Sequence, residues 1–245
     1  MPEHLLCIDI GNTLSKAAVY AGDRVVETCS GPTLDVARLA AWKHGYGLNH
    51  AMLSAVSDNP KLPLDDLRAM FTLHYPKQVG NLPFKIAYTT PETLGADRLA
   101  CMMGAYVLYP DRPVLVLQCG TCLTMDLLAD GSVYAGGSIS PGLRMRFKAL
   151  NGYTARLPLV EADTEAGLSG DSTVTSIQSG VWQGYLSECE GMIGKYNAIY
   201  EHLMVIITGG DAAAVKDKLK MTIFAFPDLV LFGLMQMLKY DIEKQ

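Results

Sequence analysis

The sequence lacks any run of lysine or arginine and carries few charges of either sign. Charged residues make up 18% of the 245 residues, and the formal net charge is −5 at pH 7. A protein that is held to nucleic acid by phosphate contacts needs clustered positive charge. The composition therefore argues against nucleic-acid binding.

Cysteine and histidine are too scattered to suggest a ligand set. The five histidines show no metal-ligand spacing, and most of the six cysteines fall inside apolar segments. Cys119-Gly-Thr-Cys122 is a lone C-x-x-C motif without a second pair. This usage favours reduced thiols and a cytoplasmic protein over a disulfide framework or a zinc site.

Long uninterrupted apolar runs are missing as well. The chain passes from Pro2-Glu3-His4 directly into an apolar strand pattern, so no signal peptide is expected. Met221 to Leu238 could be mistaken for a membrane span, but Pro227-Asp228 interrupts it. We predict a buried strand, a turn and a helix beginning near Asp228, and no membrane partner.

The stretch from Leu5 to Thr13 organises the rest of the chain. An apolar strand pattern is interrupted by Asp9, and Gly11 then allows a sharp turn and a close approach to a ligand. Asn12 tolerates left-handed backbone geometry, and Thr13 adds a hydroxyl. This order of residues suits a cradle for nucleotide phosphates and their magnesium ion. The alternative is an ordinary hairpin turn with a hydrogen-bonded aspartate.

The same pattern occurs a second time from Val114 to Cys122. Three positions of the two hairpins match, because Asp9 aligns with Gln118, Gly11 with Gly120, and Gly22 with Gly131. A repeat of strand, turn, strand, turn, strand predicts two similar α/β lobes with a cleft between them. We assign residues 1–112 to the first lobe and 113–245 to the second. A chance match is the alternative.

Periodicity and turn residues predict the remaining elements. Strands are expected over 15–21, 24–28, 51–56, 84–88, 123–128, 132–139 and 204–207. Helices are expected over 33–46, 62–73, 95–109, 143–150 and 172–203. The turn at Thr208-Gly209-Gly210-Asp211 leads into a further helix, and helix N-termini attract anions.

Six motifs occur in order along the chain. They are Asp9-x-Gly11-Asn12-Thr13-x-x-Lys16, Gly95-x-Asp97-Arg98, Gly120-Thr121, Gly137-x-Ile139-x-Pro141-Gly142, Thr208-Gly209-Gly210 and Pro227-Asp228-Leu229-Val230-Leu231-x-Gly233-Leu234. Together they resemble the motifs of type III pantothenate kinase, in the superfamily of acetate and sugar kinases, Hsp70 and actin. The resemblance covers nearly the whole chain and implies the actin-like, ribonuclease H-like fold.

The resemblance implies transfer of the ATP γ-phosphate to pantothenate, the first step towards coenzyme A. It also implies a homodimer, Mg²⁺, and a monovalent cation such as K⁺ or NH₄⁺. Asp97 matches the residue that accepts the proton of the attacking hydroxyl. The positions that match ATP contacts are Asp9, Gly11, Asn12, Thr13, Lys16, Gly120, Thr121, Gly209 and Gly210. Those that match pantothenate contacts are Tyr88, Gly95, Ala96, Arg98 and Thr173.

Each of these residues also has a structural interpretation. Asp97 could stabilise the first turn of a helix, Thr173 could be an N-cap, and Tyr88 could belong to the core. Arg98 and Lys16 could be solvated surface charges. The expected long helix could serve the dimer interface or the core of one subunit, because its apolar residues lie on more than one face.

Gln118 departs from the family pattern, which usually has aspartate there to help hold the monovalent cation. Glutamine keeps an oxygen ligand but loses the charge, and this predicts weaker cation binding. Members of the family have also been described as accessory factors in transcriptional regulation. A catalytically weak or inactive binding protein is therefore the alternative function.

Overall fold

The computed structural model describes residues 3–55, 63–78 and 82–244. The chain forms two compact units, the first of Met1–Pro110, Ser132–Tyr134 and Asp228–Gln245, and the second of Asp111–Gly131 and Ala135–Pro227. These units differ from the predicted lobes at the C-terminus, because the last segment packs with the first unit. Lys239 pairs with Asp23, and Asp241 lies 2.6 Å from His74 Nδ1, which anchors that segment.

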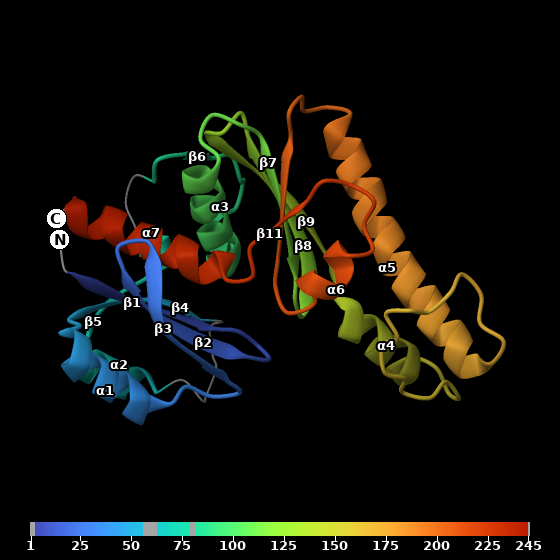
Figure 1. Cartoon of the computed structure of the whole chain (residues 1–245), viewed down its shortest axis with the longest axis horizontal. Helices are drawn as coiled ribbons and strands as arrows, with labels where there is room; N and C mark the ends of the chain where they lie inside the picture. Colours follow the sequence, from blue (N-terminus) through green and yellow to red (C-terminus); the bar gives the residue numbers. More distant parts are fainter. Residues whose placement is uncertain (1–2, 56–62, 79–81, 245) are drawn as a thin grey trace. The chain divides into compact units, whose positions relative to one another are not determined.

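The first unit is built on a mixed five-stranded sheet with the order β3-β2-β1-β4-β5 (Figure 1). Strand β1 pairs antiparallel with β2 and parallel with β4. The strands are β1 (His4–Ile10), β2 (Ser15–Ala21), β3 (Arg24–Gly31), β4 (His50–Ala55) and β5 (Thr72–His74). The helices are α1 (Val36–Tyr46), α2 (Leu64–Met70), α3 (Ala96–Leu108) and α7 (Leu229–Glu243).

Helices cover both faces of this sheet. Leu6 and Ile8 of β1 pack with Leu39 and Trp42 of α1 in one core cluster, while α7 contacts β1 and packs closely on α3. A Cβ atom on Gly233 of α7 would clash with the carbonyl oxygen of Ala100 in α3, so glycine permits this close packing. Burial on both faces explains why β1 is almost continuously apolar.

The second unit repeats this topology. Its sheet has the order β11-β10-β7-β8-β9, and the short β6 (Lys85–Ile86) pairs with Val133 and Tyr134, which belong to the first unit. The strands are β7 (Val114–Cys119), β8 (Cys122–Ala129), β9 (Val133–Pro141), β10 (Met204–Thr208) and β11 (Phe224–Ala225). The helices are α4 (Leu143–Gly152), α5 (Thr173–Asn197) and α6 (Ala212–Lys216).

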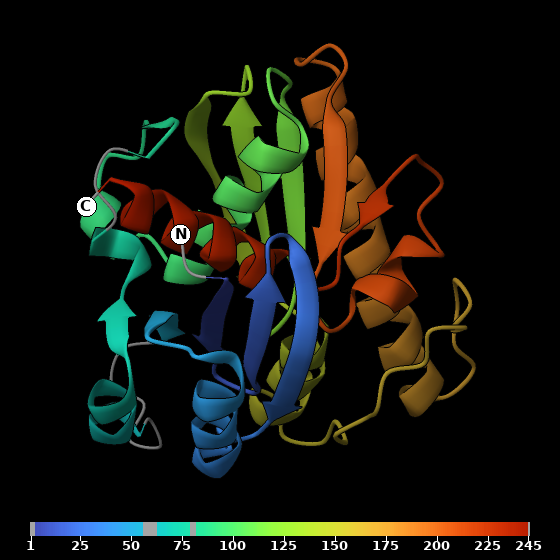
Figure 2. The ribbon, with the colours of Figure 1, turned by 60° about the vertical axis from the view of Figure 1, so that its left-hand side comes forward.

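The two sheets therefore share one order, in which β1 corresponds to β7 and β4 to β10. Strand β7 pairs antiparallel with β8 and parallel with β10, as β1 does with β2 and β4. The internal repeat that the hairpins predicted is confirmed, and with it the fold class. Helix α5 covers one face of the second sheet, where Leu115 and Leu117 pack against its buried side chains (Figure 2).

Most predicted elements are present, and several have different ends. The helix expected over 62–73 ends at Met70, because Phe71 is extended and Thr72–His74 pairs with β4 instead. The strand expected over 84–88 is reduced to β6, and the long helix expected to reach 203 ends at Asn197. Leu62 and Val56, at the ends of two predicted elements, lie outside the described residues.

The apolar stretch from Met221 to Leu238 contains β11 and the start of α7, with Asp228 at the helix N-cap, as predicted. The prediction of a buried strand is wrong, because both residues of β11, Phe224 and Ala225, are exposed at the edge of the sheet. Within the described ranges, no helix combines the length and the apolar composition that a membrane crossing requires. The six cysteines are free thiols.

Candidate active-site residues

The first candidate loop is the turn between β1 and β2. The Gly11 N–H donates to the Leu14 carbonyl over 3.1 Å and closes the turn. Asn12 and Thr13 are exposed at its tip, so their polar groups can reach a ligand. The turn is closed and its polar tip is exposed, which is compatible with the predicted phosphate cradle.

Asp9 lies at the base of this turn and is half-buried. Ser54 Oγ of β4 donates to Asp9 Oδ1 over 2.8 Å. Burial raises the pKa of Asp9 to about 6, against the lowering effect of the Ser54 hydrogen bond; the negative charge of Asp97 raises it further, and Lys16 lowers it. Two other predicted site residues, Lys16 and Asp97, are therefore close enough for their charges to act on Asp9.

Lys16 has a partner that the sequence did not reveal. It pairs across the strands with Asp9, and its Nζ lies 2.9 Å from Oδ1 of Asp228 at the N-cap of α7. The Lys16 side chain is 33% exposed and that of Asp228 46%, so Lys16 is a partly exposed lysine held in an ion pair. Ser54 and Asp228 were both missed as site residues. The available signals were a polar residue inside the apolar β4 pattern and the aspartate of the Pro227-Asp228 motif.

A second group of candidates surrounds the start of α3. Gly95 is the N-cap, and a Cβ atom there would lie 2.6 Å from Asp97 Oδ1, so the carboxylate folds back over the glycine. Arg98 is buried, with its guanidinium carbon 5.7 Å from the centre of the Tyr88 ring. Tyr88 in turn stacks on Tyr134, with ring centres 6.2 Å apart. Arg98 is therefore no solvated helix charge, and a buried guanidinium next to aromatic rings is suited to hold a carboxylate ligand.

The second loop is the turn between β7 and β8. The Gly120 N–H donates to the Cys122 carbonyl over 3.0 Å, and Thr121 is exposed. Gln118 lies opposite Thr208 of the parallel strand β10, just as Asp9 lies opposite Ser54 of β4. The structure therefore makes Gln118 the counterpart of Asp9, as the alignment of the two hairpins predicted.

The turn after β10 packs directly on this second loop. Gly209 has a positive φ of 98°, and a Cβ atom on it would clash with the carbonyl oxygen of Cys119. The Asp211 N–H donates to the same oxygen over 3.0 Å. Gly210 borders open space, so its main chain remains accessible. Gly120 and Gly209 thus belong to one loop cluster.

Thr173 begins α5 but does not cap it. Ser172 is the N-cap, since its side chain accepts from the Thr175 N–H, and Thr175 completes a capping box. The interpretation of Thr173 as an N-cap is therefore wrong. Its hydroxyl stays a candidate ligand contact.

The polar groups of these candidate residues suit a magnesium ion bound together with ATP better than a metal ion bound by protein side chains alone. In the ranges that the structure describes, no three His, Cys, Asp or Glu side chains gather into a metal site. Magnesium bound with a nucleotide needs only one or two carboxylates, because phosphates and water supply its other ligands. Asp9, with a pKa raised to about 6, is a carboxylate whose charge such a cation would stabilise.

The duplicated sheets and their glycine turns define a fold class that solved structures of other proteins share. An ATP-glucomannokinase of Arthrobacter has the same fold, with a TM-score of 0.52 at 13% identity over 98% of this chain and 99% of that one. A Campylobacter jejuni protein described as a Baf family transcriptional activator matches with a TM-score of 0.64 at 19% identity, over 97% and 99%.

Within this class, residues 5–195 match the profile of type III pantothenate kinases. A type III pantothenate kinase of Flavobacterium johnsoniae is 36% identical over 241 residues, which cover 98% of this chain and 99% of that relative. The chain belongs to the type III pantothenate kinase family.

Proposed function

We propose that this protein transfers the γ-phosphate of ATP to pantothenate, as the first step of coenzyme A synthesis in the cytoplasm. Family membership indicates the reaction. The observation that carries the assignment to this chain is that Lys16 lies opposite Asp9 in the strand register and that Asp97 is near enough for its charge to act on Asp9, all within one unit. A phosphoryl-transfer site needs such a set: a carboxylate for the metal, a cation for the phosphates, and a carboxylate to orient the nucleophile.

The roles follow from the chemistry of the side chains. Asp97 accepts the proton of the attacking pantothenate hydroxyl, and Asp9 holds the magnesium ion that neutralises phosphate charge. Arg98 pairs with the pantothenate carboxylate. The remaining ATP contacts are Gly11, Asn12, Thr13, Lys16, Gly120, Thr121, Gly209 and Gly210, and the remaining pantothenate contacts are Tyr88, Gly95, Ala96 and Thr173.

The test is a coupled assay of ADP release by the purified protein with Mg²⁺ and K⁺. We expect release that depends on pantothenate. No ADP release, or release that pantothenate does not change, would contradict the proposal. Calorimetric binding of pantothenate without turnover would indicate a binding protein instead.

We further propose that Gln118 weakens the binding of the monovalent cation, so that this protein needs more of it. An amide oxygen coordinates K⁺ or NH₄⁺ but attracts it less than a carboxylate does. Gln118→Asp is expected to lower the K⁺ concentration at half-maximal rate by about 10-fold or more, the usual range for a supporting metal ligand. K⁺ titrations of both forms measure this. Identical curves would show that position 118 is outside the cation site.

A homodimer through α5 is the third part of the proposal. Between 176 and 194, every exposed residue of this helix is serine or glycine, with a spacing of four and three residues: Ser176, Gly180, Gly184, Ser187, Gly191 and Gly194. A Cβ atom on any of these four glycines would meet open space. A helix face without charged or long side chains suits close packing against the same helix of a second copy.

Gly184→Arg is therefore expected to convert the dimer to the 26.6 kDa monomer at micromolar concentration, because a charged side chain prevents close packing of two helices. Sedimentation velocity measures this. Lys216→Ala, which truncates an exposed side chain on α6, should stay dimeric. A wild-type protein that sediments only as a monomer would refute the proposed dimer.

A further inference from the structure

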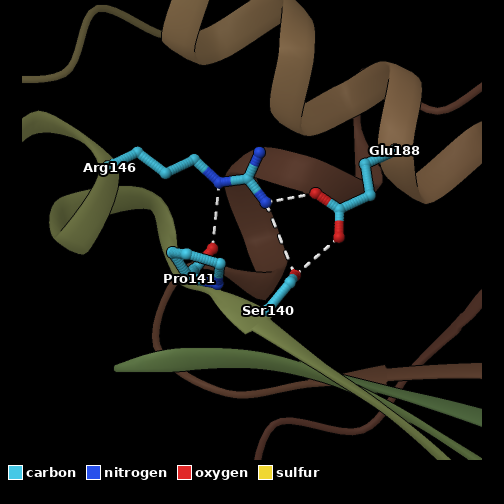
Figure 3. A network of polar contacts seen from close by, with 4 residues as sticks. All are labelled: Ser140, Pro141, Arg146 and Glu188. Carbon is cyan, nitrogen blue, oxygen red and sulfur yellow. Dashed lines mark hydrogen bonds and ion pairs between the residues drawn. The ribbon is translucent and has the colours of Figure 1, made fainter. Parts of the chain in front are cut away.

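Arg146, Glu188 and Ser140 form a polar cluster at the end of β9 that the proposed reaction does not use (Figure 3). Arg146 of α4 and Glu188 of α5 form an ion pair, with side chains 20% and 31% exposed. Ser140 Oγ donates to Glu188 Oε1 over 2.5 Å. The guanidinium carbon of Arg146 lies 4.9 Å from the centre of the Tyr185 ring. The cluster therefore ties β9, α4 and α5 together.

Arg146 also holds the main chain just before α4. Its Nε donates to the carbonyl oxygen of Pro141 over 2.9 Å, while a second guanidinium nitrogen contacts both Glu188 and Ser140 Oγ (Figure 3). The planar guanidinium donates in several fixed directions at once, which a lysine ammonium cannot reproduce. The position of Pro141 is thereby fixed relative to α5.

The next residue, Gly142, touches the second candidate phosphate loop. Its N–H donates to the carbonyl oxygen of Thr121 over 3.2 Å, and a Cβ atom on Gly142 would clash with the carbonyl oxygen of Gly120. With main chain packed on main chain, a shift of Pro141 and Gly142 must move the loop. Tyr185 provides a second connection between the polar cluster and this loop. Its buried ring belongs to the same core cluster as Cys119, the residue before Gly120.

The charge on Glu188 is maintained by this arrangement. Burial raises its pKa, but hydrogen bonds from Ser140 and Arg146 outweigh that effect and leave the pKa below the ordinary value. A partly buried, multiply hydrogen-bonded ion pair restricts geometry more than an exposed pair does.

We propose that Arg146 and Glu188 are positioning residues for the phosphates of ATP. They act through the main chain of Pro141 and Gly142, which holds the Gly120–Thr121 turn in the arrangement that receives the nucleotide. The inference rests on the proposed function, because it takes this turn as a phosphate loop.

The experiment compares the KM values for ATP and pantothenate in matched variants. Arg146→Met should raise the ATP KM by about 10- to 100-fold, the cost of small displacements in a positioned site, and leave the pantothenate KM unchanged. Arg146→Lys should recover part of the loss, and Glu188→Gln should show the same selectivity with a smaller rise. Lys218→Met, which removes the ion pair with Glu165 elsewhere in the second unit, is the control and should change neither value.

Calorimetric ADP binding separates this inference from the proposed function. Arg146→Met should weaken ADP binding as it raises the ATP KM, and this holds even if the wild type proves unable to phosphorylate pantothenate. An unchanged ATP KM or ADP affinity, with only a lower melting temperature, would overturn the inference, as would equal rises in both KM values. A wild type that binds no nucleotide overturns it together with the proposed function. If Arg146→Met does not fold, Arg146→Lys and Glu188→Gln decide by the same criteria.

Discussion

Replacing Asp97 by asparagine is expected to lower kcat by about 10²–10⁴-fold, the usual contribution of a general base. Asparagine keeps the size and one oxygen of the side chain but cannot accept the hydroxyl proton at neutral pH. The fold should tolerate the change, because Asp97 lies in the first turn of α3 and its carboxylate is folded over Gly95. Steady-state kinetics at saturating ATP and pantothenate measure the loss.

The ATP affinity of Asp97→Asn should stay close to that of the wild type. The matched control is Glu92→Gln, which neutralises an exposed acid in the 3-10 turn just before α3. It should leave kcat unchanged, since the general field of an exposed carboxylate is screened by solvent. A similar loss of kcat in both variants would assign the effect to net charge and not to proton acceptance. Full activity in Asp97→Asn would remove Asp97 from the reaction.

The predictable part of the fold lies in local patterns. Gly22 and Gly131 both have positive φ, of 63° and 67°. A hairpin turn with glycine at such a position, between two apolar runs, can be predicted from the sequence. The equivalence of Asp9 and Gln118 could also be predicted, because the hairpin turn fixes the strand register. This is why the repeated β1-β2-β3 and β7-β8-β9 hairpins could be predicted.

The unpredicted parts depend on distant partners. Ser54 reaches Asp9 across 45 positions, and Asp228 reaches Lys16 across 212, so no local pattern links them. The same holds for the end of α2, where pairing of Thr72–His74 with β4 overrides the helical pattern. The C-terminal segment was assigned to the second lobe because it follows that lobe in the chain. Its packing on α3 depends on Gly233, whose role only the tertiary structure reveals.

Asp9→Asn is expected to abolish turnover and yet stabilise the folded protein at neutral pH. The folded state holds the proton of Asp9 more tightly than the unfolded chain, because the pKa rises from 3.8 to about 6. The stability that this provides is fully present below pH 4 and is lost as the pH rises through 6. A rise of about two pKa units corresponds to at most about 3 kcal/mol, and solvent screening of the half-buried carboxylate reduces this value. The neutral amide avoids this loss and can still accept the hydrogen bond from Ser54.

Thermal or urea unfolding between pH 4 and pH 8 tests this expectation. The unfolding free energy of Asp9→Asn should exceed that of the wild type above pH 6, and the difference should shrink towards pH 4.

Asp23→Asn is the control with the opposite expected effect, because the hydrogen bond from Lys239 lowers the pKa of Asp23. Loss of that carboxylate should weaken the fold slightly at neutral pH and have no effect in acid. If Asp9→Asn is instead less stable than the wild type at pH 8, the Asp9 charge carries no cost in the free protein, and the raised pKa is refuted. Mg²⁺ with ATP should stabilise the wild type but not Asp9→Asn, since only the carboxylate offers the cation a charged ligand.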